Sequence, residues 1–581
     1  MKLDPFTLEI IKNAFVVANE EMFHAWARTA KSPVIYEVLD FAVAITDKDG
    51  NLIAEAPGVP GFSGVLDFAV KEVVQKWGKK IMPGDVIVNN IPYYSGTHLN
   101  DVTLVAPIFY KDELIGYTAT KGHWTEVGGM AFGSWNPHST EIYQEGIQLP
   151  CVRIYKNGEP NKDIIDTIII NSRLPDYTFG DMESQVASMR VATKRVLSLV
   201  DKYGLDTVLF AMKKILEESE RYALLKLREL PKGEFIAEDY IDSAIAGQEE
   251  PARIKVRVRV TDNEFIADFS GSSKQVRSPI NSPYPGTVAG VKEVFLAITD
   301  PHMTPNSGLF RPIKVIAPEG SIFNPTRPAP TSTYWEAMAC ATDLVWKALA
   351  PYVPNKLTAG HFVSIIATIV GGVNDRTGQP FAIVEPQPGG WGAGYDMDGT
   401  SGLVACGDGE TYIASSEVYE KNFPILVERY MLNTEEGTGH GKYRGGFGVI
   451  REYRILNSQA LVTIQVGRRE YPPWGVNGGY NGPGNKVILE RRGQKTEVRR
   501  LTAEILSRGD LISIRTSGGG GWGDPLDRDP KLVLEDLKNQ LITTEIAENI
   551  YGVVINANTL QINWEKTKEK RNQLKKARGR F

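Results

Sequence analysis

Hydrophobic residues recur at helical spacing in several long segments of the chain. Residues 5–30 open with a proline and place Leu8, Ile11 and Phe15 on one stripe, which predicts an amphipathic helix. The same periodicity predicts helices at 64–78, 285–299, 333–350, 530–539 and 543–551. Two further helices are expected between 183 and 228, with a break near Tyr203-Gly204.

Other segments have the composition and alternation of strands. The turn Asp47-Lys-Asp-Gly50 separates two apolar runs, 34–46 and 51–56, and predicts a hairpin. Further strands are expected at 84–90, 102–110, 113–120 and 254–260. Beyond residue 373 the chain becomes rich in glycine and in strand-like runs, so a β-rich architecture is expected there.

The length of 581 residues exceeds what one hydrophobic core accommodates and indicates three or four units. We predict an α+β, multidomain protein with mixed sheets, helical layers and a glycine-rich, β-heavy C-terminal half. The predicted regions are an N-terminal α/β region (1–182), a helical layer or connector (183–232), a second α/β region (233–372), and a glycine-rich β-rich region with short helices and a basic tail (373–581).

Composition excludes several classes of function. A net charge of -5 gives no electrostatic reason to expect nucleic acid as a partner. The basic tail, 566–580, is interpreted as a solvated terminus or a docking segment. The three cysteines, Cys151, Cys340 and Cys406, lie too far apart in sequence to indicate a disulfide scaffold, a zinc finger or an iron–sulfur cluster. Because no apolar run has the roughly 18 residues of a membrane span and no secretory signal is visible, we expect a cytoplasmic protein without membrane contact.

Four polar residues interrupt strand-like apolar runs and are candidate metal ligands. They are Asp40, His98, Asp101 and His123. A buried carboxylate needs a partner, and a divalent cation such as Zn²⁺, Mn²⁺ or Fe²⁺ suits this mixture of carboxylates and imidazoles. His98 and Asp101 are three residues apart, which a turn before the strand can direct to one ion. Structural roles for the same residues are equally compatible with the pattern.

The remaining histidines carry weaker signals. We interpret His24, His302, His361 and His440 as structural or surface residues, and His138 as part of a site loop or of a polar turn. Glu126, three residues after His123, could orient a ligand or act as a base.

Glycine clusters mark the C-terminal half at 388–394, 443–448, 475–482 and 518–525. None has the P-loop pattern or the strand–GxGxxG–helix setting of a dinucleotide site. We expect most of these glycines to serve turns that need positive φ. The cluster 389–394 is the one most suited to face a ligand, because Asp396 and Asp398 follow it. No GxSxG elbow occurs, and no cysteine has a histidine near it in sequence, so covalent nucleophilic catalysis is unsupported.

Taken together and in order, seven motifs resemble the hydantoinase B family of B-type subunits of ATP-dependent hydantoinases, 5-oxoprolinases and lactamases, to which acetone and acetophenone carboxylase subunits are related. The resemblance covers essentially the whole chain. The motifs are Gly96-Thr-His-Leu-Asn-Asp-Val, Gly122-His-Trp-Thr-Glu-Val-Gly-Gly, Ser139-Thr-Glu-Ile-Tyr-Gln-Glu-Gly, Gly180-Asp-Met-Glu-Ser-Gln, Asp268-Phe-Ser-Gly, Tyr443-Arg-Gly-Gly-Phe-Gly and Gly518-Gly-Gly-Gly-Trp-Gly-Asp-Pro.

This resemblance implies an enzyme subunit with a divalent metal, zinc or manganese, held by the four candidate ligands named above. It also implies a hetero-oligomer. An A-type partner with an actin-like ATPase fold would bind ATP and phosphorylate a small cyclic amide (a hydantoin, 5-oxoproline or a lactam), and this chain would complete ring opening. Proton handling would fall to Glu126 or Glu141, with Asp181 as a further candidate.

The chain also departs from the hydantoinase pattern. Leu39 stands where hydantoinases commonly carry arginine, Phe62 replaces a histidine, and Asn90-Ile91 replaces Asn-Asp. These changes imply a more apolar pocket, suited to a hydrophobic lactam or to a ketone. A subunit of an ATP-dependent ketone carboxylase is therefore the second interpretation, and a non-catalytic assembly protein is the third.

Overall fold

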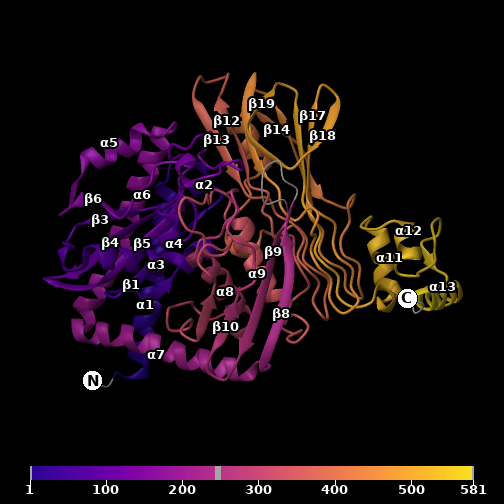
Figure 1. Ribbon diagram of the computed structural model, residues 1–581, viewed down its shortest axis with the longest axis horizontal. Coiled ribbons are helices and arrows are strands. Elements are labelled where there is room, and N and C mark those ends of the chain that lie inside the picture. Colours follow the sequence, from indigo (N-terminus) through magenta and orange to yellow (C-terminus); the bar gives the residue numbers. More distant parts are fainter. Residues whose placement is uncertain (1–2, 243–249, 579–581) are drawn as a thin grey trace.

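A seven-stranded antiparallel sheet organises the N-terminal part of the computed structural model, which describes residues 3–242 and 250–578 (Figure 1). Its strand order is β2-β1-β5-β4-β3-β6-β7. The strands are β1 (Phe41–Asp47), β2 (Leu52–Glu55), β3 (Val86–Asn89), β4 (Asp101–Tyr110), β5 (Glu113–His123), β6 (Val152–Lys156) and β7 (Glu159–Pro160). The sheet places β1, β5 and β4 side by side at its centre.

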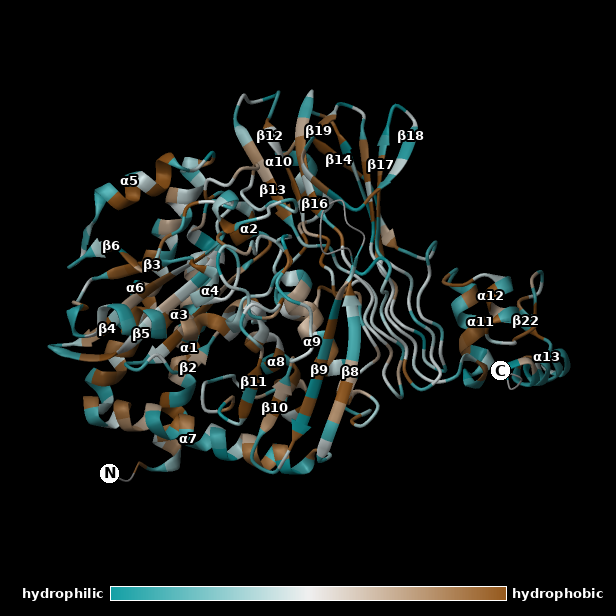
Figure 2. Ribbon diagram, viewed as in Figure 1, coloured by the Kyte–Doolittle hydropathy of each residue, from teal (hydrophilic) through white to brown (hydrophobic). Residues whose placement is uncertain are grey.

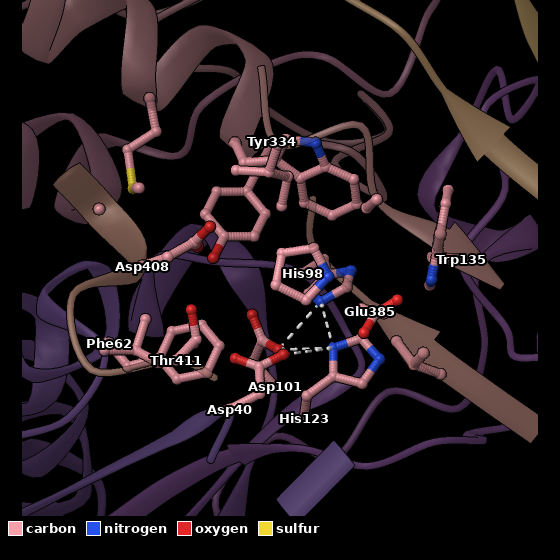
Figure 3. Close-up of a pocket in the computed structure, with 18 residues that line it drawn as sticks. Asp40, Phe62, His98, Asp101, His123, Trp135, Tyr334, Glu385, Asp408 and Thr411 are labelled. Atoms are coloured by element: carbon pink, nitrogen blue, oxygen red, sulfur yellow. Dashed lines mark hydrogen bonds and ion pairs between the residues drawn. The ribbon is translucent and has the colours of Figure 1, made fainter. Parts of the chain in front are cut away.

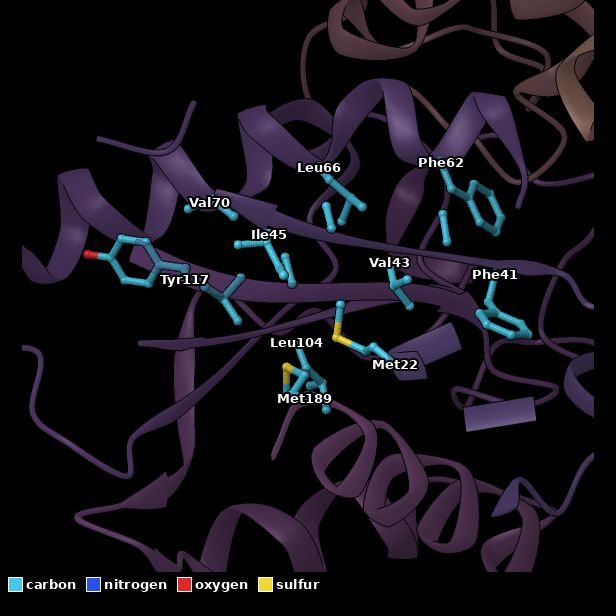
Figure 4. Close-up of a cluster of buried hydrophobic side chains, with 14 of the residues drawn as sticks. Met22, Phe41, Val43, Ile45, Phe62, Leu66, Val70, Leu104, Tyr117 and Met189 are labelled. Atoms are coloured by element: carbon cyan, nitrogen blue, oxygen red, sulfur yellow. The ribbon is translucent and has the colours of Figure 1, made fainter. Parts of the chain in front are cut away.

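Helices cover both faces of this sheet. Helix α3 (Pro60–Trp77) contacts β1 and β5, while α1 (Pro5–Thr29) and α6 (Pro175–Tyr203) pack together against the opposite face. Figure 4 shows Leu66 and Val70 of α3 on one side of β1, with Met22 of α1 and Met189 of α6 on the other. Because both faces are covered, β1 is a continuous apolar run instead of an alternating one. The shorter helices here are α2 (Pro33–Tyr36), α4 (Pro92–Ser95) and α5 (Lys162–Ile170).

Helix α7 (Leu205–Glu229) leads into a second layer, which α8 (Tyr284–Thr299) and α9 (Trp335–Leu349) build against a four-stranded sheet. The strands, in the order β11-β10-β9-β8, are β8 (Gly233–Ile241), β9 (Ala252–Val260), β10 (Phe265–Asp268) and β11 (Ile313–Ile316). Helix α9 contacts β8 and β9, so the inward residues of β9 are buried and its arginines face outward. The residues of α9 are buried almost throughout, which places this helix at the centre of the molecule.

Two antiparallel sheets form the C-terminal half, with orders β13-β12-β16-β19 and β14-β15-β20-β17-β18. Their strands are β12 (Thr368–Val373), β13 (Pro380–Glu385), β14 (Ile425–Leu432), β15 (Val449–Ile455), β16 (Gln459–Gln465), β17 (Lys486–Arg491), β18 (Gln494–Val498), β19 (Arg500–Ser507) and β20 (Leu511–Arg515). Helix α10 (Ser416–Asn422) precedes β14. A small terminal unit follows, with α11 (Pro530–Lys538), α12 (Thr544–Asn549), β21 (Ile555–Asn556), β22 (Gln561–Ile562) and α13 (Trp564–Arg578).

The glycine clusters do not mainly serve turns, contrary to our expectation. Extended segments run side by side between the C-terminal sheets and the terminal unit (Figure 1), and the backbone of 518–521 hydrogen-bonds to neighbours such as Gly446, Tyr480 and Gly360. A Cβ on Gly520 would lie 1.9 Å from the carbonyl oxygen of Trp474. Glycine is needed there because backbones approach too closely for any side chain.

The cluster 389–394 has the same structural role. A Cβ on Gly390 or Gly392 would collide with neighbouring backbone atoms. Asp398 pairs with Arg528 and accepts a hydrogen bond from the Arg444 backbone. This cluster therefore holds segments together, and the carboxylate of Asp398 is engaged by Arg528.

The predicted helices and the α+β class are confirmed, including the break at Gly204 between α6 and α7. The predicted strand over 34–46 is wrong in its first part, where Pro33 opens the short helix α2. The division into four regions stays a prediction, and its limits at 182/183 and 372/373 fall within α6 and β12. The basic tail is helical to Arg578, and residues 579 and 580 lie outside the described part.

A helix that crosses a bilayer must be both long and apolar. Within residues 3–242 and 250–578, none of the helices meets both requirements.

Candidate metal centre

Three of the four candidate ligands stand in one row across neighbouring strands. Asp101, the first residue of β4, is the register partner of His123, the last residue of β5. The register of β1 with β5 pairs Phe41 with Gly122, and one position further the His123 amide donates to the Asp40 carbonyl. Side chains at one register level of antiparallel strands point to the same face. The sheet therefore brings these three side chains together at the end of its central strands.

His98 joins the row from the turn before β4. Gly96 adopts φ +74°, and a Cβ at this position would lie 2.4 Å from the Cβ of Pro285, so glycine is required. The turn directs His98 Nε2 to within 2.9 Å of Asp101 Oδ1 and 3.2 Å of His123 Nδ1. On a straight strand, His98 and Asp101 would point to opposite faces because they are three residues apart. The turn instead brings both side chains to the same side.

The donor atoms converge closely enough to hold one ion. Ligand atoms of His98, Asp101 and His123 lie within 4.8 Å of one another, and all three residues are buried. Asp40 Oδ2 is 3.9 Å from His123 Nδ1 and completes the group (Figure 3). Asp101 Oδ2 and His123 Nε2 are buried without a hydrogen-bond partner. Two imidazoles and two carboxylates with unused buried donor atoms are a donor set that fits a divalent cation.

A backbone carbonyl fixes the orientation of His98. Its Nδ1 lies 3.0 Å from the carbonyl oxygen of Ser332. Because a carbonyl only accepts, Nδ1 carries a proton and donates it, so Nε2 is the nitrogen that faces the group. A metal ion would bind this ring through the lone pair of an unprotonated Nε2.

The two aspartates of the group have shifted pKa values, in opposite directions. Burial by itself would raise the pKa of Asp101, but the adjacent His98 and His123 outweigh it and hold that pKa well below its usual range. Burial raises the pKa of Asp40 to about 7, although His123 opposes this rise. Asp101 therefore carries a charge at neutral pH in the group as described, while Asp40 is partly protonated there.

A largely apolar pocket opens beside the group. Its walls come from the N-terminal sheet, from α9 and from the β12–β13 hairpin (Figure 3). The apolar lining residues are Val59, Phe62, Trp135, Tyr334, Trp335, Met338, Ile365, Ala367 and Val384. The polar ones beyond the ligands are Glu385, Asp408 and Thr411, and among the described residues neither lysine nor arginine lines this pocket. Phe62 thus provides apolar wall, in agreement with the inference from its sequence position.

Glu145 supports the site and was missed by the sequence analysis. Its buried carboxylate accepts hydrogen bonds from the backbone amides of Thr331 and Ser332, at 3.0 and 2.9 Å, and from the Ser139 hydroxyl. It thereby fixes the segment whose Ser332 carbonyl orients His98. A glutamate six residues beyond Ser139 gives no signal of this role in sequence, because its partners Thr331 and Ser332 lie 186 and 187 residues away.

The three carboxylates proposed for proton transfer lie outside the residues that line the pocket. Glu126 is buried and accepts hydrogen bonds from Gly128 and Gly133 amides, and it pairs with Arg173 at 2.9 Å. Glu141 is exposed and caps a single turn of 3₁₀ helix. Asp181, on α6, accepts from the amides of Lys31 and Ser32. Each has a structural partner, so the structure offers no geometric support for these roles.

A partly buried contact joins a cysteine and a histidine that are 45 residues apart in the chain. Cys406 Sγ lies 3.4 Å from His361 Nε2, and His361 Nδ1 lies 3.8 Å from Asp343 Oδ1. His361 is therefore a buried structural residue whose acidic neighbour, Asp343, is distant in sequence. Burial lowers the pKa of His361 to about 3 and raises that of the Cys406 thiol well above its usual value, so this pair is neutral and not an activated nucleophile.

His138 contacts the Thr502 hydroxyl at 2.6 Å, which favours the polar-turn interpretation over a site loop.

Comparison with known proteins finds relatives over almost the full length. A family model described as hydantoinase B/oxoprolinase matches residues 4–525. A putative B-type chain of a D-/L-hydantoinase from Pseudomonas sp. (strain NS671) is 33% identical over 595 residues, covering 98% of each protein. The beta chain of caprolactamase from Pseudomonas jessenii is 31% identical, over 96% of this chain and 97% of that one.

Two solved structures have a similar fold over almost the whole of this chain. A crystal structure of the ATP-dependent caprolactamase from Pseudomonas jessenii matches with a TM-score of 0.92 at 28% identity, over 98% of this chain and 100% of that chain. A nucleotide-free acetone carboxylase structure also gives a TM-score of 0.92, over 99% of this chain and 83% of that chain. At 20% identity the second match shows a shared fold only.

Proposed function

The chain belongs to the hydantoinase B/oxoprolinase family, and from that premise we propose that it is the metal-bearing B-type subunit of an ATP-dependent cyclic amide hydrolase. The observation that carries the proposal is the convergence of Asp40, His98, Asp101 and His123 beside one buried, mostly apolar pocket. The relatives named as subunits of hydantoinase and caprolactamase support an enzyme that acts together with a partner chain.

We assign the four residues as ligands of Zn²⁺ or Mn²⁺. When bound, such an ion supplies Lewis-acid chemistry and polarises a water or substrate oxygen placed against it. The chain's own residues do the remainder: Ser332 holds His98 in its ligand tautomer, and Asp101 supplies the fixed negative charge. The surrounding aromatic side chains exclude bulk water, which strengthens each electrostatic contact in the pocket.

The partner would provide the ATP chemistry. This chain carries neither a P-loop pattern nor a strand–GxGxxG–helix motif, and we assign ATP binding and phosphorylation of the substrate carbonyl oxygen to an A-type subunit. Phosphorylation turns the amide oxygen into a leaving group and makes the carbon susceptible to water. The division of labour requires that the isolated chain neither hydrolyses ATP nor opens the ring at an appreciable rate.

The lining residues favour an uncharged substrate. Besides the ligands assigned to the metal, Glu385 and Asp408 line the pocket, and no lysine or arginine of the described ranges joins them, so the carboxylate of a charged substrate would have only the assigned metal ion as a cationic partner. A neutral lactam or hydantoin fits this environment better than 5-oxoproline.

Carboxylation of a ketone is the second candidate function. It is favoured by the apolar wall built from Phe62, Trp135 and Met338 and by the fold shared with acetone carboxylase. In that case a phosphorylated enol would release its enolate, which would capture CO₂ or bicarbonate in the same pocket.

One assay on the complex with the cognate A-type subunit separates these functions. Neutral lactams, hydantoin, 5-oxoproline and small ketones are each supplied with ATP and labelled bicarbonate, while ring-opened amine and labelled acid are quantified. Amine without label supports hydrolysis, whereas label in the product would replace it by carboxylation. Failure of Asp101→Asn to reduce metal content, relative to the exposed control Asp112→Asn, would remove the metal assignment.

A further inference from the structure

A short turn from the second half of the chain forms the pocket wall next to Asp40. Cys406–Asp408 make one turn of 3₁₀ helix, and both Asp408 and Thr411 line the pocket. The Tyr412 amide donates to the Val38 carbonyl at 2.9 Å, which anchors this turn two residues before Asp40. Gly409, with φ +47°, lies so close to Pro60 that a Cβ would be 2.4 Å from its ring. The turn is therefore held firmly against the N-terminal region.

Two polar atoms of this turn are buried without a partner. They are Asp408 Oδ2 and Thr411 Oγ1. A buried carboxyl or hydroxyl without a hydrogen bond is costly, by about 1–3 kcal/mol for each group, and such exceptions in a folded protein call for an explanation. Both residues belong to the pocket lining, and in Figure 3 they lie on the other side of Asp40 and Asp101 from His123. A ligand in the pocket is the partner that satisfies both.

Asp408 is not part of the metal group. The ligand atoms of His98, Asp101 and His123 lie within 4.8 Å of one another, and Asp40 joins them at 3.9 Å from His123 Nδ1, whereas among the described residues no ion pair links Asp408 to either histidine. Asp408 stands apart from them, beside the Tyr334 ring (Figure 3). It is thus a carboxyl free to act on another atom of the substrate.

Ring opening of a phosphorylated cyclic amide has a chemical requirement that such a carboxyl meets. Water adds to the activated carbon, which then bears a hydroxyl, the phosphorylated oxygen and the ring nitrogen. If the carbon–oxygen bond to phosphate breaks, the amide is restored and ATP is wasted. If the carbon–nitrogen bond breaks instead, its electron pair passes to nitrogen, which must receive a proton to leave as an amine. A proton donor at the nitrogen therefore determines whether the ring opens or the amide is restored with loss of ATP.

We propose that Asp408 donates this proton to the ring nitrogen and that Thr411 hydrogen-bonds the substrate beside it. As the carbon–nitrogen bond breaks, the acid form of Asp408 gives its proton to nitrogen, and the hydroxyl on the same carbon becomes a carbonyl by returning a proton to the Asp408 carboxylate. The products are an amine and an acyl phosphate, and a second water hydrolyses the acyl phosphate to carboxylate and phosphate. This inference rests on the proposed hydrolase function.

The surroundings of Asp408 favour its acid form. Burial, with a smaller contribution from the neighbouring carboxyl group of Glu293 on α8, raises the pKa of Asp408 to about 7. The other titratable groups nearby are Asp40, Tyr334 at the start of α9, and Cys406 on the same turn. Among the described side chains, none of these groups is a cation.

The test measures how much ring-opened amine forms per phosphate released. The complex with its A-type subunit is assayed with a neutral lactam for wild type, Asp408→Asn, Asp408→Glu, Thr411→Val and the exposed control Asp396→Asn. We expect Asp408→Asn to lower the amine-to-phosphate ratio about 100-fold, with metal content and substrate-stimulated phosphate release retained. Asp408→Glu should restore part of the ratio, Thr411→Val should raise KM more than it lowers kcat, and the control should behave as wild type.

The outcomes distinguish the role of Asp408 from the hydrolase function itself. An unchanged ratio in Asp408→Asn, or a parallel loss of amine and phosphate together with metal, would overturn the role of Asp408 while leaving the hydrolase intact. Absence of amine from wild type with every cyclic amide would instead refute the proposed function, and with it the need for this proton.

Discussion

Glu145 permits a direct test of whether the loop behind His98 tunes metal affinity. Its carboxylate accepts hydrogen bonds from two backbone amides, Thr331 and Ser332, and the Ser332 carbonyl orients His98. Glu145→Ala leaves those buried amides without acceptors, at a cost of about 1–3 kcal/mol each, so we expect a loss of about 2–6 kcal/mol in stability. When the groups that orient a ligand imidazole are no longer held in place, metal affinity falls by about 10–100-fold.

The assay combines metal titration against a competing chelator with thermal unfolding, with and without Zn²⁺ or Mn²⁺. Because burial raises the pKa of Glu145 to about 7, the titrations are run above about pH 8, where its carboxylate form predominates. Glu145→Gln keeps one carbonyl oxygen as an acceptor and should lie between wild type and Glu145→Ala. Glu159→Ala, an exposed glutamate on β7, is the matched control.

Two results would refute this reasoning. If Glu145→Ala lowers the melting temperature but binds metal as tightly as wild type, Glu145 supports the fold without positioning His98. If neither property changes, the hydrogen bonds that it accepts contribute nothing measurable.

Three shorter predictions concern the metal, pH and glycine packing. Metal at 100 times its Kd should stabilise the wild-type chain and Asp112→Asn by about 2.7 kcal/mol but leave Asp101→Asn unchanged, and an equal shift of melting temperature in all three would contradict the ligand assignment. Burial raises the pKa of Glu293 to about 8 from 4.5, so the native state holds a proton that the unfolded state loses, and stability falls as pH rises from about 5 to 8. Glu293→Gln should therefore gain melting temperature over wild type increasingly across that window, and a pH-independent difference would count against buried protonation. Gly520→Ala should cost about 3 kcal/mol or more, because its Cβ would lie 1.9 Å from the Trp474 carbonyl oxygen, and an unchanged melting temperature would show that the packed glycine segments can yield.

The local pattern of apolar and polar residues was sufficient to predict the strands that carry the candidate ligands. The runs 102–110 and 113–120 predicted β4 and β5, and isolated polar residues at the ends of apolar runs identified Asp40, His98, Asp101 and His123 as a group worth testing. This succeeds because a polar side chain next to a strand buried on both faces must have a special partner.

The carboxyl group to which we assign proton transfer could not be found in the same way. Glu126 and Asp181 look suitable in sequence, yet their carboxylates accept backbone amides elsewhere. Asp408 has no distinguishing neighbours in sequence, and it reaches the pocket only because its turn is anchored to the Val38 carbonyl. The glycine clusters were wrongly predicted to be turns for a related reason. In the sequence, glycines required by close packing of distant backbones look the same as glycines required by turns.

The amino-acid sequence by itself determined which segments become helices and strands, and it singled out the two aspartates and two histidines, because periodicity and the cost of burying a charge act over a few residues. Only the tertiary structure decided which strands became neighbours, which carbonyl orients His98, and which carboxyl faces the pocket opposite the metal group. Those choices depend on contacts between residues that are far apart in the chain, such as His98 with Ser332 and Val38 with Tyr412. Such contacts arise from the packing of whole layers against one another and are not encoded in any single stretch of chain.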